Sequence, residues 1–483
     1  MFARLLGSLT LTAMTTSPLA AQTPGELVRK AIAAMGGEPA LRSLTSTVAE
    51  FNSASFGLGQ EETPLSPARG PIAFGRIVTD FANQRRLLEQ ELRPIAGGAS
   101  RQRRVTAGGI GMTVANGVQT ADAPPATALV LQAMRLQPER LLIRALEAKL
   151  TGVAPRTWRG EWKGGVRFGV DGDTVSLYFD RLSGLPTVAL TVTDDPILGD
   201  RRTVTWYTRW QSAGSVLLPR QIDVEVNGRL QSQTYFTGIT ANGAVTDSMF
   251  SIPDSIASRA RALPSGPAPV VVQLVELASG VWRAEGGSHH SLVVDQGAAL
   301  LVVEAPQSAR RFQAVLDTLR RRFPGKPVGT VVSTHHHWDH TGGIRTALAA
   351  GLPVVAHRRN VGFLQSIRTA RKTVAPDALS RGRAVPAIRP VDDSLGLGRG
   401  PGRALVYRIP TTHAEGLLGV YLPESRILFT SDVVNPGAAP LPALGSAELV
   451  EAARRLGIAV DRYAGGHGVV VSWADLSRAA GRP

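Results

Sequence analysis

Cysteine is absent from all 483 residues of this chain. The absence excludes disulfide bonds, thiolate metal ligands, a cysteine nucleophile and a lipid attached to an N-terminal cysteine. A metal site in this protein would therefore have to use histidine and carboxylate side chains. Hydrophobic residues make up 43% of the chain and charged residues 19%, which is typical of a soluble globular protein.

Lysine is also scarce, because it supplies five of the 53 basic residues and the other 48 are scattered arginines. The formal net charge of +15 would suit a nucleic-acid partner if the cations were clustered. The basic residues do not alternate with aromatic residues as they do in proteins that bind single strands. We therefore expect no nucleic-acid partner, and we interpret the charge as compositional bias on solvated surfaces.

The N-terminal segment has the layout of a secretory signal peptide. In "MFARLLGSLTLTAMTTSPLAAQ" the positive charge of Arg4 precedes a short apolar stretch, and the small residues Ala20 and Ala21 precede Gln22. We expect residues 1–21 to be removed and the mature protein to be periplasmic or secreted. The segment is too short and too rich in Thr and Ser for a good membrane span, so no transmembrane span is expected. An uncleaved N-terminal anchor is the alternative.

The chain is too long for one ordinary core, and its pattern divides into two halves. Residues 22–261 begin with two helical stretches, the second broken at Pro138, and continue from about residue 157 with short alternating strands. This pattern predicts an α+β domain with a curved antiparallel sheet. Residues 262–269, "ALPSGPAP", are a linker of Pro and Gly, and residues 270–483 form the second domain.

The layout of the first domain resembles the half-barrel of periplasmic lipoprotein-carrier proteins. A "DRLSGLP" turn, a "LLPRQIDV" strand and a closing "TDSMFSIPDS" segment carry the resemblance. It implies a hydrophobic groove that would take an acyl chain or another lipid. The alternative, which we favour, is a packed scaffold that positions or shields the second domain.

The second domain alternates buried strands with helices, which predicts an α/β fold whose strands deliver side chains to one edge. Its most informative segment is "STHHHWDHTGG". We expect "TVVST" to be a strand that leads into this motif, so that His335 and His337 project on one face and His336 on the other. Asp339 and His340 then lie in the turn that leads to a helix. Imidazole nitrogens and a carboxylate oxygen that converge at one strand end favour zinc.

Histidine is otherwise rare, since the chain has nine in total and none in its first 288 residues. His413 follows a strand in "PTTHAEG", and Asp432 ends an apolar strand in "LFTSDVV". His467 lies in "AGGHGVV", where the flanking glycines permit close approach of the backbone. These three residues are further candidates for the metal site.

This ordered set of residues resembles the metallo-β-lactamase fold superfamily of binuclear metallohydrolases, over about residues 270–483. The resemblance implies an αββα sandwich with two zinc ions at one edge of its sheets, iron or manganese being the alternative metals. It also implies the ligands. The first zinc takes His335, His337 and His413, the second takes Asp339, His340 and His467, and Asp432 bridges both.

The same resemblance implies an exported zinc hydrolase that uses a metal-bridging hydroxide to cleave a small-molecule ester, thioester, lactone or lactam. Asp339 would be the catalytic side chain, which fixes the hydroxide and shuttles its proton. Diiron oxidoreductase relatives usually have glutamate in place of His337, and β-lactamases proper typically lack an aspartate equivalent to Asp432. Both residues therefore favour the thioesterase, lactonase or phosphodiesterase branches. The alternative is an exported lipid- or ligand-binding protein whose metal domain is structural or regulatory.

The remaining histidines have weaker assignments. His289 and His290 lie in the loop "GGSHHS", where contact with substrate and a solvated turn are equally good interpretations. We expect His336 to pack or to hydrogen-bond rather than to bind metal. We expect His357, which ends a strand beside two arginines, to be structural.

Overall fold

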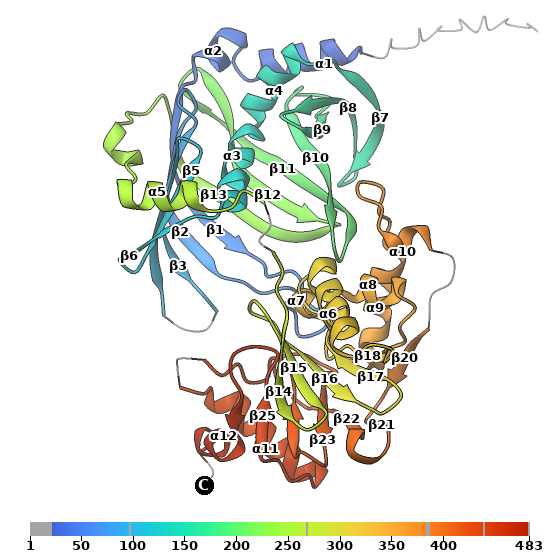
Figure 1. Cartoon of the computed structure of the whole chain (residues 1–483). Helices are drawn as coiled ribbons and strands as arrows, with labels where there is room; N and C mark the ends of the chain where they lie inside the picture. The colour runs from blue at the N-terminus through green and yellow to red at the C-terminus, as the bar shows by residue number, and fades with distance from the viewer. Residues whose placement is uncertain (1–21, 96–97, 267–268, 383–386, 438–439, 482–483) are drawn as a thin grey trace, which may run out of the picture.

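The structure is a computed structural model that describes residues 22–95, 98–266, 269–382, 387–437 and 440–481. The expected signal peptide, residues 1–21, lies outside the described residues. The N-terminal half forms the upper part of Figure 1 and the C-terminal half the lower part. None of the described helices is long and apolar enough to span a membrane.

The N-terminal domain is built on one antiparallel sheet of 13 strands, in the order β6-β5-β4-β3-β2-β1-β13-β12-β11-β10-β9-β8-β7. The strands are β1 (Ser46–Ser55), β2 (Ile72–Asp80), β3 (Arg85–Arg93), β4 (Ser100–Ala107), β5 (Ile110–Ala115), β6 (Val118–Ala121), β7 (Thr151–Trp158), β8 (Glu161–Val170), β9 (Asp173–Phe179), β10 (Pro186–Asp195), β11 (Gly199–Ala213), β12 (Val216–Val226) and β13 (Arg229–Ala241).

Strands β1 to β6 were missed in the sequence, which predicted strands only from about residue 157. The segment "RRLLEQELR" of β3 explains the omission, because its residues are good helix formers in isolation. Here they pair with β2 on one side and β4 on the other. Tertiary pairing therefore overrides the local preference.

The helices of this domain are α1 (Pro24–Ala34), α2 (Glu38–Ser43), α3 (Pro124–Arg135), α4 (Pro138–Glu147), the short η1 (Asp247–Phe250) and α5 (Asp254–Ala262). Thr23 and Glu26 form a capping box at the start of α1. Pro138 separates α3 from α4, as predicted. The buried Leu141 and Leu142 of α4 pack with α1, α2 and the sheet strands β8 to β12 in one apolar cluster.

The C-terminal domain has two sheets, ordered β14-β15-β16-β17-β18-β19-β20 and β21-β22-β23-β24-β25-β26. Their strands are β14 (Gln273–Ala278), β15 (Val281–Glu285), β16 (Ser291–Asp295), β17 (Leu300–Val303), β18 (Val328–Val332), β19 (Val354–His357), β20 (Ile388–Val391), β21 (Ser394–Leu397), β22 (Ala404–Arg408), β23 (Leu418–Leu422), β24 (Ile427–Phe429), β25 (Arg462–Ala464) and β26 (Val471–Ser472). The helices are α6 (Ala309–Arg322), α7 (Trp338–Thr341), α8 (Ile344–Ala349), α9 (Arg358–Thr369), α10 (Ala378–Arg381), the short η2 (Gly400–Gly402), α11 (Ala443–Leu456) and α12 (Trp473–Ala479).

Three apolar clusters define the layers of this domain. One cluster joins the inner faces of the two sheets and includes Val303 and Val420. A second lies between the first sheet and α6, α8 and α9, and a third lies between the second sheet and α11 and α12. The order of layers is therefore helix, sheet, sheet, helix, which is the αββα sandwich that the resemblance implied.

The two domains interlock through the turn between β10 and β11. Ile197 in this turn is 4% exposed and belongs to the apolar cluster of the first C-terminal sheet. The carboxylate of Asp200 accepts a hydrogen bond from the backbone N–H of Thr373 at 2.6 Å, and Lys372 forms an ion pair with Asp194. The N-terminal domain thus contributes a side chain to the core of the C-terminal one.

Candidate metal centre

The histidine motif begins where a buried parallel strand ends. Strand β18 stops at Val332, and residues 333–337 form a loop, so the strand does not continue to His335 as expected. The one-turn helix α7 follows and carries Asp339 and His340. The next residue after α7, Gly342, lies so close to the neighbouring chain that an added Cβ would be 2.2 Å from a backbone oxygen. This close packing fixes the path of the loop and α7.

Three sets of side chains bring their ligand atoms together, with all atoms of a set within 4.8 Å of one another. Two of these sets share no residue, and we call them the first and the second ligand group. The third set, Glu304, His335 and His340, takes one histidine from each of the other two. The first ligand group comes from the loop after β18, the turn before β23 and the turn after β24. The second comes from the loop before β16, from α7 and from the loop after β25. The first comprises His335, His337, His413 and Asp432, and the second comprises His289, Asp339, His340 and His467.

Three buried imidazole nitrogens of the first ligand group have no hydrogen-bond partner among the described residues: His335 Nε2, His337 Nδ1 and His413 Nε2. The other ring nitrogen of His335 lies 3.0 Å from Thr334 Oγ1, and that of His337 lies 3.0 Å from the carbonyl oxygen of Glu61. A buried polar atom without a hydrogen-bond partner is unfavourable unless a bound ligand supplies the missing partner. The donor set therefore fits a zinc-like cation.

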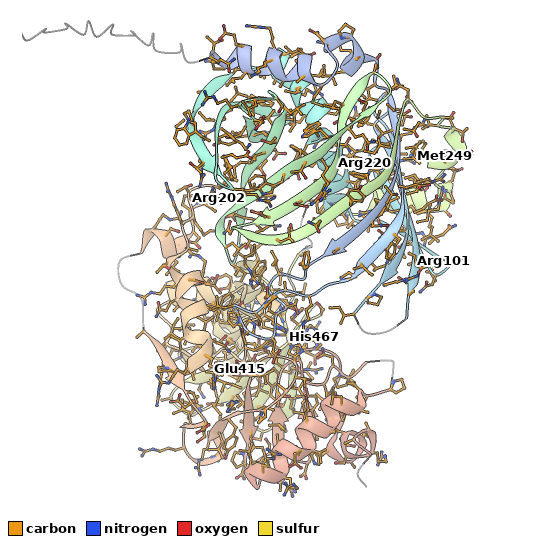
Figure 2. All side chains as sticks on the ribbon, turned by 180° about the vertical axis from the view of Figure 1, so that it is seen from behind. Arg101, Arg202, Arg220, Met249, Glu415 and His467 are labelled. Carbon is orange, nitrogen blue, oxygen red and sulfur yellow. The ribbon has the colours of Figure 1, made fainter. Side chains whose placement is uncertain are left out.

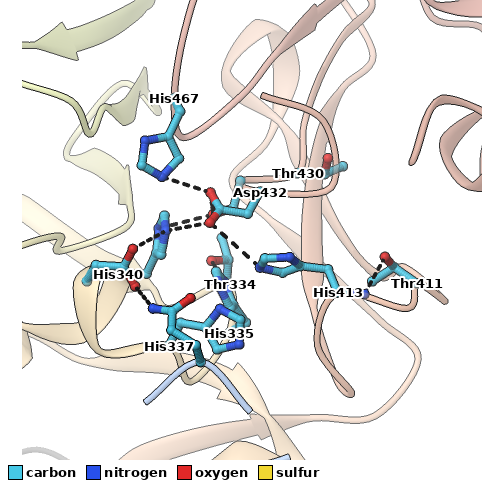
Figure 3. A network of polar contacts seen from close by, with 12 residues as sticks. Thr334, His335, His337, His340, Thr411, His413, Thr430, Asp432 and His467 are labelled. Atoms are coloured by element: carbon cyan, nitrogen blue, oxygen red, sulfur yellow. Dashed lines mark hydrogen bonds and ion pairs between the residues drawn. The ribbon is translucent and has the colours of Figure 1, made fainter. Parts of the chain in front are cut away.

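Asp432 connects the two groups (Figure 3). Its Oδ2 lies 2.9 Å from His340 Nε2 and 3.6 Å from His413 Nε2, and its Oδ1 lies 3.2 Å from His467 Nε2. Burial acts to raise the pKa of this carboxyl, but the hydrogen bonds from His340 and His467 outweigh burial and hold the pKa well below its usual range. The side chain is therefore an anion placed between both sets of imidazoles.

Backbone and carboxylate acceptors orient the rings of the second ligand group. His340 Nδ1 lies 3.0 Å from Glu304 Oε2, and His467 Nδ1 lies 2.8 Å from the carbonyl oxygen of Ser288. Because both partners accept, these Nδ1 atoms carry the protons when the rings are neutral, and each Nε2 is left for a metal.

The carboxylate of Asp339 lies against His289, whose Nε2 is 3.2 Å from Asp339 Oδ2. The other oxygen, Oδ1, accepts a hydrogen bond from the side-chain amide of Gln60 at 2.8 Å. Burial acts to raise the pKa of Asp339, but the contacts with His289, His340 and Gln60 outweigh it and lower the pKa. With 35% of its side chain exposed, this anion is the more accessible of the two carboxylates in the ligand groups.

The histidines of the two ligand groups differ in the direction of their pKa shifts. Burial lowers the pKa of all three histidines of the first ligand group, in the case of His413 to about 4. In the second ligand group burial also acts to lower the pKa of His340, but Glu304 and Asp432 outweigh it and raise the pKa. Asp432 likewise outweighs burial and raises the pKa of His467. Protons therefore compete with a cation more strongly at the second ligand group than at the first.

Glu304 is a residue of the site that the sequence did not reveal. It follows β17, is 0% exposed and has a φ of +75°. Its Oε1 accepts from the hydroxyl of Thr334 at 2.6 Å, and its Oε2 faces His340. Thr334 in turn contacts His335, so this one carboxylate supports a histidine in each group. The available signal was a charged residue that ends the apolar run "LLVVE".

Sequence comparison places the domain in a family. Residues 284–479 match the metallo-beta-lactamase superfamily. The C-terminal domain is a metallo-β-lactamase domain. The chain is also 27% identical, over 193 residues, to the 2,4-dinitroanisole O-demethylase subunit alpha of Nocardioides sp. (strain JS1661). That match covers 39% of this chain and 55% of the relative, so the chain spans about half of the relative's length.

Solved metallo-β-lactamases resemble this domain at low identity. The enzyme from Pontibacter korlensis is 18% identical with a TM-score of 0.35, and the match covers 43% of this chain and 95% of that one. FIM-1 from Pseudomonas aeruginosa, in its mono-zinc form, is 16% identical with a TM-score of 0.36, and the match covers 44% and 96%.

The metallo-β-lactamase domain brings all seven expected ligands into the two groups. Their roles as ligands remain a prediction, and so does the role of Asp339 in proton transfer. The expected first set of three histidines coincides with the histidines of the first ligand group, and the expected second set falls entirely within the second ligand group. The seven are His335, His337, Asp339, His340, His413, Asp432 and His467.

The other histidines of the metallo-β-lactamase domain divide into two kinds. His289 and His290 are 8% and 7% exposed, which excludes a solvated turn for both. His289 joins the second ligand group, whereas His290 belongs to neither, and burial lowers its pKa to about 4. His336 hydrogen-bonds to a carbonyl at 2.8 Å, and His357 accepts from a backbone N–H at 3.3 Å to cap α9. Both contacts agree with the structural roles that we expected.

Proposed function

We propose that this chain is a metal-dependent hydrolase, with zinc as the preferred metal, that cleaves an ester, thioester, lactone or lactam. The observation that carries the proposal is the set of three unpaired buried nitrogens in the first ligand group, next to a carboxylate shared with the second. Buried nitrogens without a hydrogen-bond partner are unfavourable, and a bound cation would supply the missing partner. Iron and manganese are the alternative metals for the same nitrogen and oxygen donors.

The chain's own residues suit hydrolysis. Divalent ions in the two groups would supply Lewis acidity and a water-derived nucleophile at neutral pH. Asp339 is an ionised carboxylate whose Oδ2 faces His289 and whose Oδ1 accepts a hydrogen bond from Gln60. It therefore offers an oriented acceptor for a proton from a reacting water, close to where the ions would lie. Glu304 and Asp432 keep the neighbouring imidazoles in fixed orientations.

The test is a panel of chromogenic esters, thioesters, lactones and a cephalosporin, assayed before and after treatment with a chelator. We expect activity that the chelator abolishes and zinc restores. The His413→Ala variant removes one of the three unpaired nitrogens and should lose activity even with excess zinc. A fully metallated protein that is silent on the whole panel would refute the hydrolase and favour the exported binding protein instead.

A second candidate reaction comes from the relative in Nocardioides, whose name describes O-demethylation of 2,4-dinitroanisole. Hydrolysis of an aryl methyl ether adds water and releases a phenol and methanol. The same panel should therefore include 2,4-dinitroanisole, from which the coloured dinitrophenolate would be released. Turnover of this ether in preference to all carbonyl substrates would favour the second candidate.

For the N-terminal domain we favour the scaffold over the lipid carrier. The cavity between the start of α4 and strands β1, β2, β12 and β13 has a volume of about 50 Å³. Pockets for small organic ligands are typically about 300 Å³ or more, so this cavity would take an acyl chain only if α4 moved. Two larger hollows of the same domain, of about 990 and 630 Å³, include charged side chains such as Arg76, Glu89 and Lys30 in their linings. A charged lining suits an acyl chain poorly. Export remains a proposal that rests on residues 1–21, and N-terminal sequencing of the mature protein should then begin at Gln22.

A further inference from the structure

The loop between β1 and β2, residues 56–71, crosses from the N-terminal sheet to the metal centre. The backbone N–H of Trp338 donates to the carbonyl oxygen of Gly59 at 3.1 Å, and that of Glu415 donates to the carbonyl oxygen of Glu62 at 2.7 Å. Figure 3 shows the blue ribbon of the N-terminal domain beside His337, and Figure 2 shows Glu415 in the C-terminal domain near the boundary. The β1–β2 loop is therefore attached both to the histidine motif and to the turn that carries His413.

The carbonyl oxygen of Glu61 determines which nitrogen of His337 is free. It lies 3.0 Å from His337 Nε2 and 2.8 Å from His336 Nε2. A carbonyl oxygen only accepts, and it has two lone pairs, so both imidazoles donate to it. The proton of neutral His337 is then on Nε2, and its Nδ1 keeps a lone pair. That Nδ1 is one of the three unpaired atoms of the first ligand group.

The position of Glu61 is itself fixed by the N-terminal sheet. Its side chain is buried at 4% exposure, with Oε1 2.6 Å from the guanidinium of Arg229 at the start of β13. Its Oε2 accepts from the backbone N–H of Gly59 at 2.8 Å. Arg229 also donates to the carbonyl oxygen of Ser66 at 3.2 Å, farther along the same loop. One arginine of the central sheet thus holds the loop at two points.

Gln60, the next residue along the loop, acts on the second ligand group. Its amide donates to Asp339 Oδ1 at 2.8 Å, while Asp339 Oδ2 lies 3.2 Å from His289 Nε2 and 3.7 Å from His340 Nε2. The amide therefore hydrogen-bonds to Asp339 Oδ1 and leaves Oδ2 directed toward His289 and His340. Neighbouring residues of one loop thus orient one ligand in each group.

We propose that the β1–β2 loop is an integral part of the metal centre, in which Glu61 and Gln60 are positioning residues for His337 and Asp339. The N-terminal domain then contributes to metal affinity, because the metallo-β-lactamase domain alone has an incomplete set of supporting contacts. The inference rests on the proposed metal site. Acceptors and donors that orient metal ligands typically change metal affinity by about 10- to 100-fold when they are removed.

The experiment uses the full chain and four variants. Gln60→Ala removes the donor to Asp339, and Gln60→Glu keeps its size but replaces the donor with a carboxylate. Arg229→Ala releases Glu61. Leu65→Ala is the matched control, because Leu65 lies in the same loop but is 96% exposed. Metal content, zinc affinity by chelator competition, the absorption spectrum of the cobalt-substituted protein and the melting temperature are measured for each.

We expect Gln60→Ala and Arg229→Ala to bind zinc about 10- to 100-fold more weakly and to alter the cobalt spectrum, with Leu65→Ala like the wild type. Gln60→Glu should be the weakest at the second ligand group, since two carboxylates would then face each other. If the loop only fills space, Gln60→Glu will bind as the wild type does. If Gln60→Ala and Arg229→Ala bind two ions as tightly as the wild type does, this inference is overturned, but the proposed function is not. A wild type that binds no metal would overturn the proposed function as well.

Discussion

The Asp432→Asn substitution is expected to weaken metal binding selectively and to lower turnover. The asparagine has the same size, so the fold should survive, but the negative charge between the two ligand groups is lost. Removal of one partner from a buried, hydrogen-bonded charge pair costs about 2 to 5 kcal/mol of binding free energy. At about 1.4 kcal/mol for each factor of ten, a cost of about 3 kcal/mol corresponds to a loss of about 10²-fold in affinity and in turnover.

The distances predict where the loss is largest. Asp432 lies 2.9 Å from His340 Nε2 and 3.2 Å from His467 Nε2, both in the second ligand group, but 3.6 Å from His413 Nε2 in the first. We therefore expect the second site to lose its ion first. Zinc stoichiometry at increasing chelator concentration, together with turnover at saturating zinc, measures both effects.

The matched control is Asp392→Asn, an aspartate of the same domain whose side chain is 60% exposed in a surface ion pair. Surface pairs of this kind contribute about 0 to 1 kcal/mol, so the control should keep its zinc and its turnover. If Asp432→Asn retains two ions per chain and turns over within a few-fold of the wild type, Asp432 is not a bridging ligand. The reasoning from its position between the groups would then be refuted.

Three further predictions follow from the geometry of the site and of the domain boundary. As the pH falls, the second site should release zinc before the first, because the pKa values of His340 and His467 are raised whereas burial lowers those of the histidines in the first ligand group. Metal analysis after dialysis at stepwise lower pH would show this order. Simultaneous release from both sites would contradict it. Ile197→Ala should destabilise the full chain by about 2 to 4 kcal/mol in urea unfolding, because a buried side chain is removed from the core of the C-terminal domain. The control Val192→Ala, on the same hairpin but 42% exposed, should change stability little, and equal effects would mean that the interface is not packed as described. Glu304→Gln should weaken zinc binding by about tenfold or more, because a neutral amide orients the imidazoles of His335 and His340 less firmly than a carboxylate does. The control Glu424→Gln, at an exposed position, should leave the zinc affinity unchanged.

The seven expected metal ligands could be picked out from the sequence because their signal is local. The motif around His335 concentrates imidazoles within a few residues, and His413, Asp432 and His467 each follow an apolar strand. The ends of neighbouring strands meet at one edge of a sheet, so their side chains converge whatever the rest of the chain does. The same locality explains why the break between α3 and α4 at Pro138 was predicted correctly.

Only the tertiary structure determined what supports these ligands. Gln60 and Asp339 are 279 residues apart, and no spacing rule connects residues in different domains. Glu61 acts through its main-chain carbonyl, which every residue type possesses, so its identity carries no signal for that contact. Ile197 would suit the core of either domain equally well by composition. Short-range patterns indicate which side chains are candidates to bind a metal, whereas the packing of the two domains determines how those side chains are oriented.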